Sequence, residues 1–444
     1  MRSALVPLLA FLTLFYFSAN ANSQSNERWE QLNSDGLKAS HQARYTDAEG
    51  LYNAALKEAE MFDPEDPRVF ITLSNLGSLY VEQGKYSAGE ELLRRAQVMA
   101  EKFEATENPG FAAMLANLAL AYKHQGKLAE AEVNLERALS IRQKFLGDEH
   151  PSTALNLNNL AELYRDQGKY DRAEAYDKRA LAIFEKTPGA ESDVAVSLNN
   201  LGLVYLAQAR YAEAEAALQR ALPLYEKTLG PDHPRIALAL SNLGVVYRLT
   251  GRYGDAEPLY QRSLLISEKI FGADNPSLAI PLNNLAVLYR MEGKYEESRI
   301  LYQRTLFLLE KNLGSQHPNV ATALNNLAFL DEAQSRNADA ENHYRRALSI
   351  TENAFGADHP NVAMILNNLG HLYSSEGKDD AAEVSYKRAL SIRERSLGRD
   401  HPAVADTLQN YAALLRRNKR LSEAAALEDR AKAIQLGQEQ NPLK

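Results

Sequence analysis

Residues 282–289 read Leu-Asn-Asn-Leu-Ala-Val-Leu-Tyr, and residues 293–295 read Gly-Lys-Tyr. Versions of this stretch recur along most of the chain. The second asparagine of each version is Asn75, Asn117, Asn159, Asn200, Asn242, Asn284, Asn326, Asn368 or Asn410. Successive positions differ by 42 residues, and once by 41. A fixed period in this range is typical of a solenoid of stacked helical units. We therefore expect one elongated array of repeats rather than several globular domains.

The composition of the 444-residue chain is that of a folded protein, with 45% hydrophobic and 24% charged residues. The formal net charge of −8 argues against a nucleic-acid partner, which favours a basic surface. The chain has no cysteine. Disulfides, thiolate catalysis and cysteine-ligated zinc are therefore excluded.

The first 21 residues have the three parts of a secretory signal peptide. Met1-Arg2 is a short positive start, residues 4–17 are apolar, and residues 19–21 read Ala-Asn-Ala. The alternative is an uncleaved membrane anchor, but the apolar run is shorter than the roughly 20 residues of a spanning helix and contains Pro7. We expect an exported protein, periplasmic or secreted, with no stable membrane span after cleavage. A polar lead-in (22–28), ten repeats (29–436) and a polar tail (437–444) would follow.

Each repeat reads as two helices. In the first helix around Asn284, the helical period places five residues on a packing face, namely Leu282, Leu285, Ala286, Leu288 and Tyr289. The small residue at the position of Ala286 should let the second helix approach closely. Gly293 should end the first helix in a left-handed conformation. The second helix should then run from about Glu296 to Leu313, with apolar residues at Ile300, Leu301, Thr305, Leu308 and Leu309.

Repeats 4 and 8 depart from this pattern. Asp331 replaces the usual tyrosine of repeat 8, and residues 335–337 read Ser-Arg-Asn instead of Gly-Lys-Tyr. In repeat 4, Asp177 occupies a position that is usually bulky and apolar, and the linker 187–189 lacks His-Pro. We expect these repeats to be less stable. The histidines that precede a linker proline, such as His317, are expected to be helix-entry residues rather than metal ligands, because they lie at least one repeat apart.

The recurring motif Leu-x-x-Leu-[Gly/Ala]-x-x-Tyr, followed by Gly-[Lys/Arg]-Tyr-x-x-Ala-Glu and Arg-Ala-Leu, resembles the tetratricopeptide repeat. The 42-residue period is similar to the long repeats of kinesin light chains. This resemblance implies an all-α, right-handed superhelical solenoid of about ten helix pairs, with the first helices lining a concave groove. It further implies that peptide is contacted by the asparagines matching the family's peptide-binding positions, which are Asn159, Asn200, Asn242, Asn284, Asn326 and Asn368.

The asparagine column has two interpretations. Its amides could bind a peptide backbone, or they could form a ladder of hydrogen bonds between neighbouring first helices, and both can hold at once. Given the resemblance we favour peptide contact. The neighbouring residues on this face add an apolar floor and two cations, which are Leu203, Val245, Leu249, Val287, Met291, Phe329, Arg248 and Arg290. We expect a peptide or protein partner with apolar and acidic residues, although the arginines could instead pair with acids of the array itself.

The sequence contains no phosphate-binding loop, nucleophile elbow or histidine pair on one helix. The glutamates of the Ala-Glu motif read as exposed residues with partners four positions away. We therefore expect no enzymatic activity, metal or cofactor. The leading hypothesis is an exported scaffold that binds a peptide segment or partner protein in its groove. The alternative is a structural component of an envelope or secretion assembly that uses its convex face and its ends, and the oligomeric state stays open.

Overall fold

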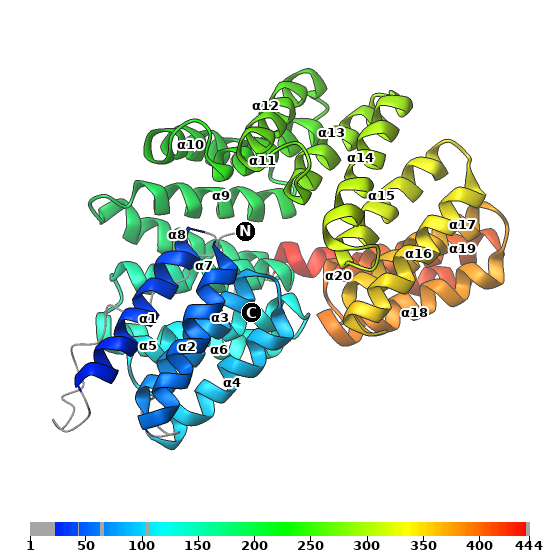
Figure 1. Ribbon diagram of the computed structural model, residues 1–444. Coiled ribbons are helices and arrows are strands. Elements are labelled where there is room, and N and C mark those ends of the chain that lie inside the picture. Colours follow the sequence, from blue (N-terminus) through cyan, green and yellow to red (C-terminus); the bar gives the residue numbers. More distant parts are fainter. Residues whose placement is uncertain (1–22, 43, 63–65, 104–105, 441–444) are drawn as a thin grey trace. The chain divides into compact units, whose positions relative to one another are not determined.

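A computed structural model of the chain describes residues 23–42, 44–62, 66–103 and 106–440, and all regular secondary structure in these ranges is helical (Figure 1). The first helices of the ten repeats are α1 (Ser23–His41), α3 (Pro67–Glu82), α5 (Pro109–His124), α7 (Pro151–Asp166), α9 (Glu191–Ala207), α11 (Pro234–Leu249), α13 (Ala279–Met291), α15 (Pro318–Ala333), α17 (Pro360–Ser375) and α19 (Pro402–Arg417). A short 3-10 helix, η2 (Pro276–Leu278), leads into α13.

The second helices alternate with the first along the chain. They are α2 (Tyr45–Phe62), α4 (Tyr86–Lys102), α6 (Leu128–Leu146), α8 (Tyr170–Lys186), α10 (Tyr211–Leu229), α12 (Tyr253–Phe271), α14 (Tyr295–Leu313), α16 (Asn337–Phe355), α18 (Asp379–Leu397) and α20 (Leu421–Gln440). The predicted signal peptide lies outside the described residues. The predicted polar lead-in is helical from Ser23 onward, and α20 continues into the predicted tail. No helix in the described part of the chain is long and apolar enough to span a membrane.

The chain divides into two compact units, an N-terminal unit of residues 1–163 and a C-terminal unit of residues 164–444. Within the N-terminal unit, α3 packs on α4 and α4 on α5. Within the C-terminal unit the same order continues, for example from α17 through α18 to α19 (Figure 1). This packing of sequential helix pairs confirms the all-α solenoid. Its handedness stays a prediction.

The predicted packing face of the first helix is confirmed in α13. Leu282, Ala286 and Leu288 are fully buried, whereas Ile280 on the opposite side is 56% exposed. The small residue makes room for the second helix as expected. At the matching position of α11, a Cβ added to Gly244 would lie only 2.6 Å from Cε1 of Tyr260. A larger side chain there would force these two helices apart.

The second helix was predicted less accurately. Thr305, Leu308 and Leu309 of α14 are buried as expected. Ile300 is 64% exposed, so its assignment to the packing side was wrong. Tyr302, which the prediction passed over, is buried against Ala286. The bulky tyrosine on the second helix therefore fills the space that the small residue on the first helix leaves.

The turn between the two helices needs one left-handed residue. Gly293 has φ +78°, as predicted. Among the described residues, three repeats place a residue with a side chain at the same point, and their φ angles are +57° for Ala209, +56° for Ser335 and +59° for Lys419. A left-handed conformation costs a non-glycine residue roughly 1–2 kcal/mol. These three turns are therefore strained relative to the glycine turns.

The glutamates of the Ala-Glu motif have the expected partners four positions away, as in the pair of Glu341 with Arg345, but they are mostly buried rather than exposed and they also join consecutive repeats. Glu341 of α16 accepts hydrogen bonds from the Tyr373 hydroxyl at 3.0 Å and from Lys378 Nζ at 3.1 Å. These contacts, made against the opposing effect of burial, lower the pKa of Glu341. The same pairing of glutamate with the next repeat's tyrosine and cation links Glu49 to Tyr80 and Lys85.

Repeat 8 exchanges the charges of this contact. Arg299 stands where the other second helices have the glutamate, and Asp331 stands where the next first helix has the tyrosine. Their side chains lie 2.9 Å apart, and His343 Nδ1 lies 2.9 Å from the other oxygen of Asp331. Burial acts to raise the pKa of Asp331, but His343 and Arg299 outweigh it and the pKa is lowered. Asp331 is thus charge-paired inside the fold. Asp177 of repeat 4 is also buried, and the lower stability of both repeats stays a prediction.

The linker histidines cap the first helices, which confirms the interpretation of these residues as helix-entry residues. Nδ1 of His317 accepts from the backbone N–H of Asn319 at 3.1 Å. The same bond, two residues ahead, is made by His150, His233, His359 and His401. No cluster of three potential metal ligands occurs in the ranges that the structure describes.

Candidate partner-binding face

The asparagine column forms a ladder between neighbouring first helices. Nδ2 of the second asparagine donates to Oδ1 of the first asparagine in the preceding repeat. This bond runs from Asn326 to Asn283 at 2.6 Å, from Asn242 to Asn199 at 2.8 Å, and from Asn368 to Asn325 at 2.9 Å. It recurs from Asn410 to Asn367 and from Asn75 to Asn33, both at 3.2 Å. The structural interpretation of the column therefore holds for most of its members.

Three asparagines are exceptions, because the preceding repeat offers no amide. Asn117 follows a repeat with Ser74 at this position and donates to the hydroxyl of Ser78 at 2.6 Å instead. Asn284 faces back toward the position of Ser241, whose hydroxyl is bonded to Ser263 at 2.9 Å. Asn159 faces back toward the position of Ala116. Over the described ranges, the side-chain amides of Asn159 and Asn284 have no hydrogen-bond partner within the chain, and both residues are only partly buried. Asn200 is likewise partly buried, on α9.

The predicted apolar residues of the C-terminal unit lie beside this ladder with their side chains open to solvent. Leu249 and Phe329 are each 43% exposed and Met291 is 38% exposed. Leu203, Val245 and Val287 are partly buried. Three further residues extend the patch, namely Leu238 at 43%, Ile280 at 56% and Met364 at 36% exposure. Each stands four residues before its asparagine, so helical spacing alone could have found them.

Arg248 and Arg290 lack acidic partners. Nη1 of Arg248 donates to Sδ of Met291 at 3.3 Å, and the Arg290 guanidinium lies 4.6 Å from the centre of the Phe329 ring. Among the described residues, no carboxylate oxygen lies within 4.0 Å of either guanidinium. Nε of Arg290 is buried without a hydrogen-bond partner. The alternative that these arginines pair inside the array is therefore wrong for this pair of residues.

The corresponding cations in other repeats do pair inside the array. Lys123 on α5 forms an ion pair with Glu162 on α7, and Arg416 pairs with Glu428 at 2.6 Å. Arg165 lies 3.2 Å from Asp166. At the C-terminal end of the apolar patch, Glu332 and His371 bind each other at 2.6 Å, and this bond raises the pKa of His371.

We call the open surface the first-helix face. It consists of the asparagine column on α11, α13, α15 and α17, the six exposed apolar residues named above, Val245, Val287, Arg248 and Arg290. The contacts of Arg248 with Met291, of Arg290 with Phe329 and of Glu332 with His371 join the four helices. Such a surface can bury apolar side chains, bind carboxylates and satisfy backbone groups.

Sequence models of known families match most of the chain. A tetratricopeptide repeat model matches residues 110–186, 193–264, 236–311, 277–353, 319–395 and 377–436, and a second one matches residues 74–144. The chain belongs to the tetratricopeptide repeat family. Proteins of this family generally mediate protein–protein interactions and are generally non-enzymatic. No curated protein gave a significant match.

Several solved structures are similar to this protein. A putative kinesin light chain repeat protein from Podosopora anserina is 24% identical over 46% of this chain and 97% of its own, with a TM-score of 0.40. The Rap protein complexed with Competence and Sporulation Factor is 15% identical over 83% of this chain and 98% of its own, with a TM-score of 0.56. The apo form of the quorum sensor NprR from B. thuringiensis is 16% identical over 75% of this chain and 89% of its own, with a TM-score of 0.54. All three are less than 25% identical to this chain, and the last two likenesses show the fold alone, while the first carries no argument.

Proposed function

We propose that this protein is an exported, non-enzymatic scaffold that binds a peptide segment or partner protein on the first-helix face of its C-terminal unit. One observation carries the proposal. Arg248 and Arg290 have no carboxylate partner within the described chain, and they lie directly against exposed Met291 and Phe329. Cations and large apolar side chains left open together are features of interaction surfaces.

The chemistry of the face defines its partner. Leu249, Met291 and Phe329 would bury large apolar side chains, while the two guanidinium groups bind carboxylates. Phe329 also contacts Arg290 by a cation–π interaction, and the guanidinium charge would attract a carboxylate. The free amide of Asn284 can both donate to and accept from a peptide backbone. The expected partner is therefore a segment with a few large apolar residues and at least one carboxylate.

Export is proposed from residues 1–21, whose positive start, apolar run and Ala-Asn-Ala end are typical of a cleaved signal peptide. In a bacterium the protein would then act in the periplasm or outside the cell. N-terminal sequencing of the protein from the native host tests this point. A chain that begins at Asn22 supports export, whereas an intact Met1 in the cytoplasmic fraction contradicts it.

The binding proposal is tested by capture of partners from envelope extract with immobilised mature protein. The double variant Met291→Ser with Phe329→Ser removes the apolar centre of the face. The matched control, Ile300→Ser with Phe307→Ser, removes side chains that are 64% and 59% exposed on the second helix α14. We expect the first variant to lose the captured protein and the control to retain it, with both variants folded by circular dichroism.

The reverse result would favour the alternative function, a structural component that uses its convex face. A specific observation supports keeping this candidate. Four second-helix residues of the C-terminal unit, Leu265, Ile300, Phe307 and Val384, are each at least 59% exposed, which is more than any apolar residue of the first-helix face. Charged residues lie on the same surface: Arg262, on the same helix as Leu265, forms an ion pair with Glu226 of α10.

A further inference from the structure

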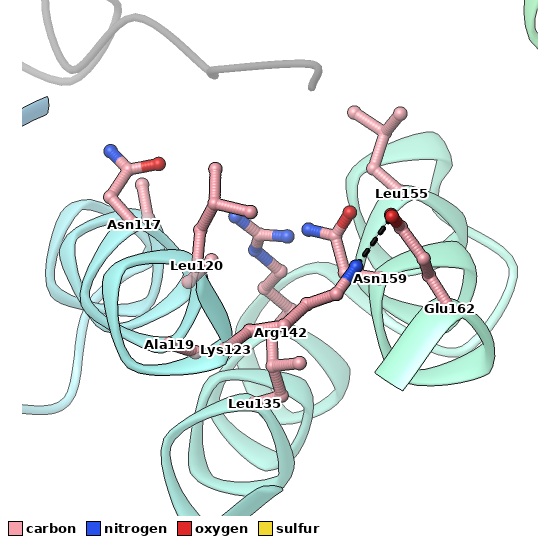
Figure 2. A pocket seen from close by; sticks show the side chains of 11 residues that line it. Asn117, Ala119, Leu120, Lys123, Leu135, Arg142, Leu155, Asn159 and Glu162 are labelled. Atoms are coloured by element: carbon pink, nitrogen blue, oxygen red, sulfur yellow. Dashed lines mark hydrogen bonds and ion pairs between the residues drawn. The ribbon is translucent and has the colours of Figure 1, made fainter. Parts of the chain in front are cut away.

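A small cavity in the N-terminal unit lies between α5, α6 and α7 (Figure 2). Its volume is about 30 Å³. The residues that line it are Ala113, Ala116, Asn117, Ala119, Leu120, Lys123, Leu135, Arg142, Leu155, Asn159 and Glu162. Since a cavity needs roughly 10–15 Å³ of such space to hold one water, this one has room for a group of two or three heavy atoms.

The cavity exists because two side chains of α5 are small. At the positions of Ala113 and Ala116, the following repeat has Leu155 and Asn158. Ala116 is also the residue that deprives Asn159 of the ladder partner found in other repeats. The amide of Asn159 therefore lines a cavity instead of a neighbouring asparagine (Figure 2).

Arg142 of α6 lies at the wall of this cavity and is only 3% exposed. Its Nη1 donates to the backbone oxygen of Ser152 at 3.0 Å and to Oδ1 of Asn156 at 3.3 Å, both neutral acceptors. No carboxylate oxygen lies within 4.0 Å of its guanidinium in the described ranges. Burial lowers the pKa of Arg142 to about 10. A buried cation without a counter-ion is unfavourable, so an anion in the cavity would stabilise it.

The other charges at the cavity cancel. Lys123 and Glu162, which also line the cavity, form an ion pair with each other (Figure 2). Asn117 donates to the hydroxyl of Ser78 at 2.6 Å. The site therefore has a net charge of one positive unit from Arg142, together with the donor of the Asn159 amide.

Arg393 of α18 is an internal comparison. It occupies the same position in its repeat, is 8% exposed, and its Nη1 binds the Ala403 oxygen and the Thr407 hydroxyl, ten and fourteen residues ahead, as Arg142 binds Ser152 and Asn156. The two arginines therefore share the structural task of joining a second helix to the next first helix. Among the residues that differ around them, the position of Leu155 is occupied in the later repeat by Asp406, whose charge favours charged Arg393.

We propose that the cavity at Arg142 binds a single carboxylate group, held by the Arg142 guanidinium and the amide of Asn159. The net charge matches a monoanion. The volume matches one planar carboxylate. Asp406 beside Arg393 shows that the chain itself places a carboxylate near this type of arginine. The ligand would come from an acidic side chain, from the C-terminus of a peptide, or from a small free carboxylic acid.

The test follows the arginine side-chain N–H resonances of the mature protein labelled with ¹⁵N-arginine, with Arg142→Lys assigning the resonance of Arg142. Sodium acetate is the first probe, and acetamide is its neutral control. Ac-Gly-Asp-Gly-NH₂ and Ac-Gly-Gly-Gly then represent an acidic side chain and a C-terminus, with Ac-Gly-Asn-Gly-NH₂ as the neutral peptide. We expect a saturable shift of the Arg142 resonance with acetate and none with acetamide.

Two variants occupy the cavity from within. Ala116→Asn introduces the residue type that other repeats have at this position and gives Asn159 a ladder partner. Leu155→Asp introduces the carboxylate that the repeat of Arg393 has. Both should weaken acetate binding at least tenfold while the fold is retained, and Arg393→Lys, the matched control, should leave binding unchanged.

The three probes distinguish the possible sources of the carboxylate. Binding of acetate and of either peptide identifies a peptide-derived carboxylate, whereas binding of acetate alone identifies a small acid. A wild-type resonance that does not shift, or a shift that survives in both Ala116→Asn and Leu155→Asp, overturns the proposal. Because the site lies in the other unit, Met291→Ser with Phe329→Ser should not affect it, so this test and that of the first-helix face fail independently.

Discussion

The N-terminal unit and the helices α11, α13 and α15 of the C-terminal unit treat the same surface position in opposite ways. The residue six positions after a ladder asparagine contacts the residue three positions after the asparagine of the next repeat in the pairs Lys123–Glu162, Arg290–Phe329 and Glu332–His371. In the N-terminal unit these residues are Lys123 and Glu162, which pair. On α11, α13 and α15 they are Arg248 with Val287 and Arg290 with Phe329. One change of residue type, from acid to apolar, thus turns a closed surface into an open one.

This difference shows how an array of similar repeats can localise binding. The contacts that hold neighbouring repeats together, which we call the framework, pair most charged side chains. An example is Glu341, which binds Tyr373 and Lys378 of the next repeat. Where a repeat omits the partner, a cation or an amide is left for another molecule. In the C-terminal unit, the residues left without such a partner include Arg248, Arg290 and Asn284. In the N-terminal unit they include Arg142 and Asn159. The distinction between closed and open groups leads to the following predictions.

The largest effect is expected at a closed pair. Asp331→Ala removes the partner of buried Arg299, and breaking such a pair costs about 3–5 kcal/mol because a charge is left buried. Hydrogen exchange of α15 and α16 should therefore accelerate strongly. Combining Arg299→Glu with Asp331→Tyr, which restores the residue types of the other repeats, should recover most of the protection. A single variant as stable as the wild type would show that the pair is not needed.

The histidine helix caps should make the free energy of unfolding depend on pH, independently of partner binding. Burial lowers the pKa of His317, His359 and His401, and only neutral Nδ1 can accept the capping bond. The folded state therefore binds fewer protons than the unfolded chain. The stability from these caps is complete above pH ~6.5 and is lost as pH falls through the lowered pKa, by about 1 kcal/mol per cap.

Urea unfolding at pH 7.5 and pH 5.5 measures this loss. Replacing the three histidines by asparagine, which does not titrate and already caps η2 as Asn275, should flatten the profile. His371 acts in the opposite direction, because Glu332 raises its pKa and stabilises the folded state at lower pH. A steeper loss in the asparagine variant than in the wild type would contradict the assignment.

A smaller gain is expected from the turn of repeat 8. Ser335→Gly relieves a left-handed residue and should stabilise α15 by about 0.5–1 kcal/mol after the extra unfolded-chain entropy of glycine. Partner capture should be unchanged, because Ser335 lies outside the first-helix face. Glycine introduced at Ser374, which has an ordinary helical neighbourhood in α17, is the control and should destabilise.

The smallest effect on stability is expected at the open cations. Arg248→Gln and Arg290→Gln should each change the free energy of unfolding by less than about 0.5 kcal/mol, as is usual for residues without internal charge partners. Their effect should appear in partner capture instead. A large loss of stability in either variant would mean that these arginines belong to the framework.

The sequence was sufficient for the repeat period, the helix pairs, the packing face and the turn glycines, because each is a local pattern. The contacts between repeats were harder to predict, because they depend on which residues of neighbouring helices lie side by side. Once the offset between neighbouring helices is known, Ala116 and Ser241 mark the free amides of Asn159 and Asn284 directly. The same offset shows that Arg299 and Asp331, which replace the usual glutamate and tyrosine, are a matched pair of substitutions that contact each other. Arg142 was missed because its cavity arises from alanines on another helix.

The central claim is that apolar residues at two positions keep the face of the C-terminal unit open. Val287→Glu together with Phe329→Glu would give Arg248 and Arg290 the acidic neighbours that Lys123 has in Glu162. The most direct measurement is capture of the partner from envelope extract by this double variant, with Glu162→Val as the matched change in the N-terminal unit. The account predicts a folded double variant that captures at least tenfold less partner and a control that captures as the wild type does. Undiminished capture by the folded double variant would contradict it.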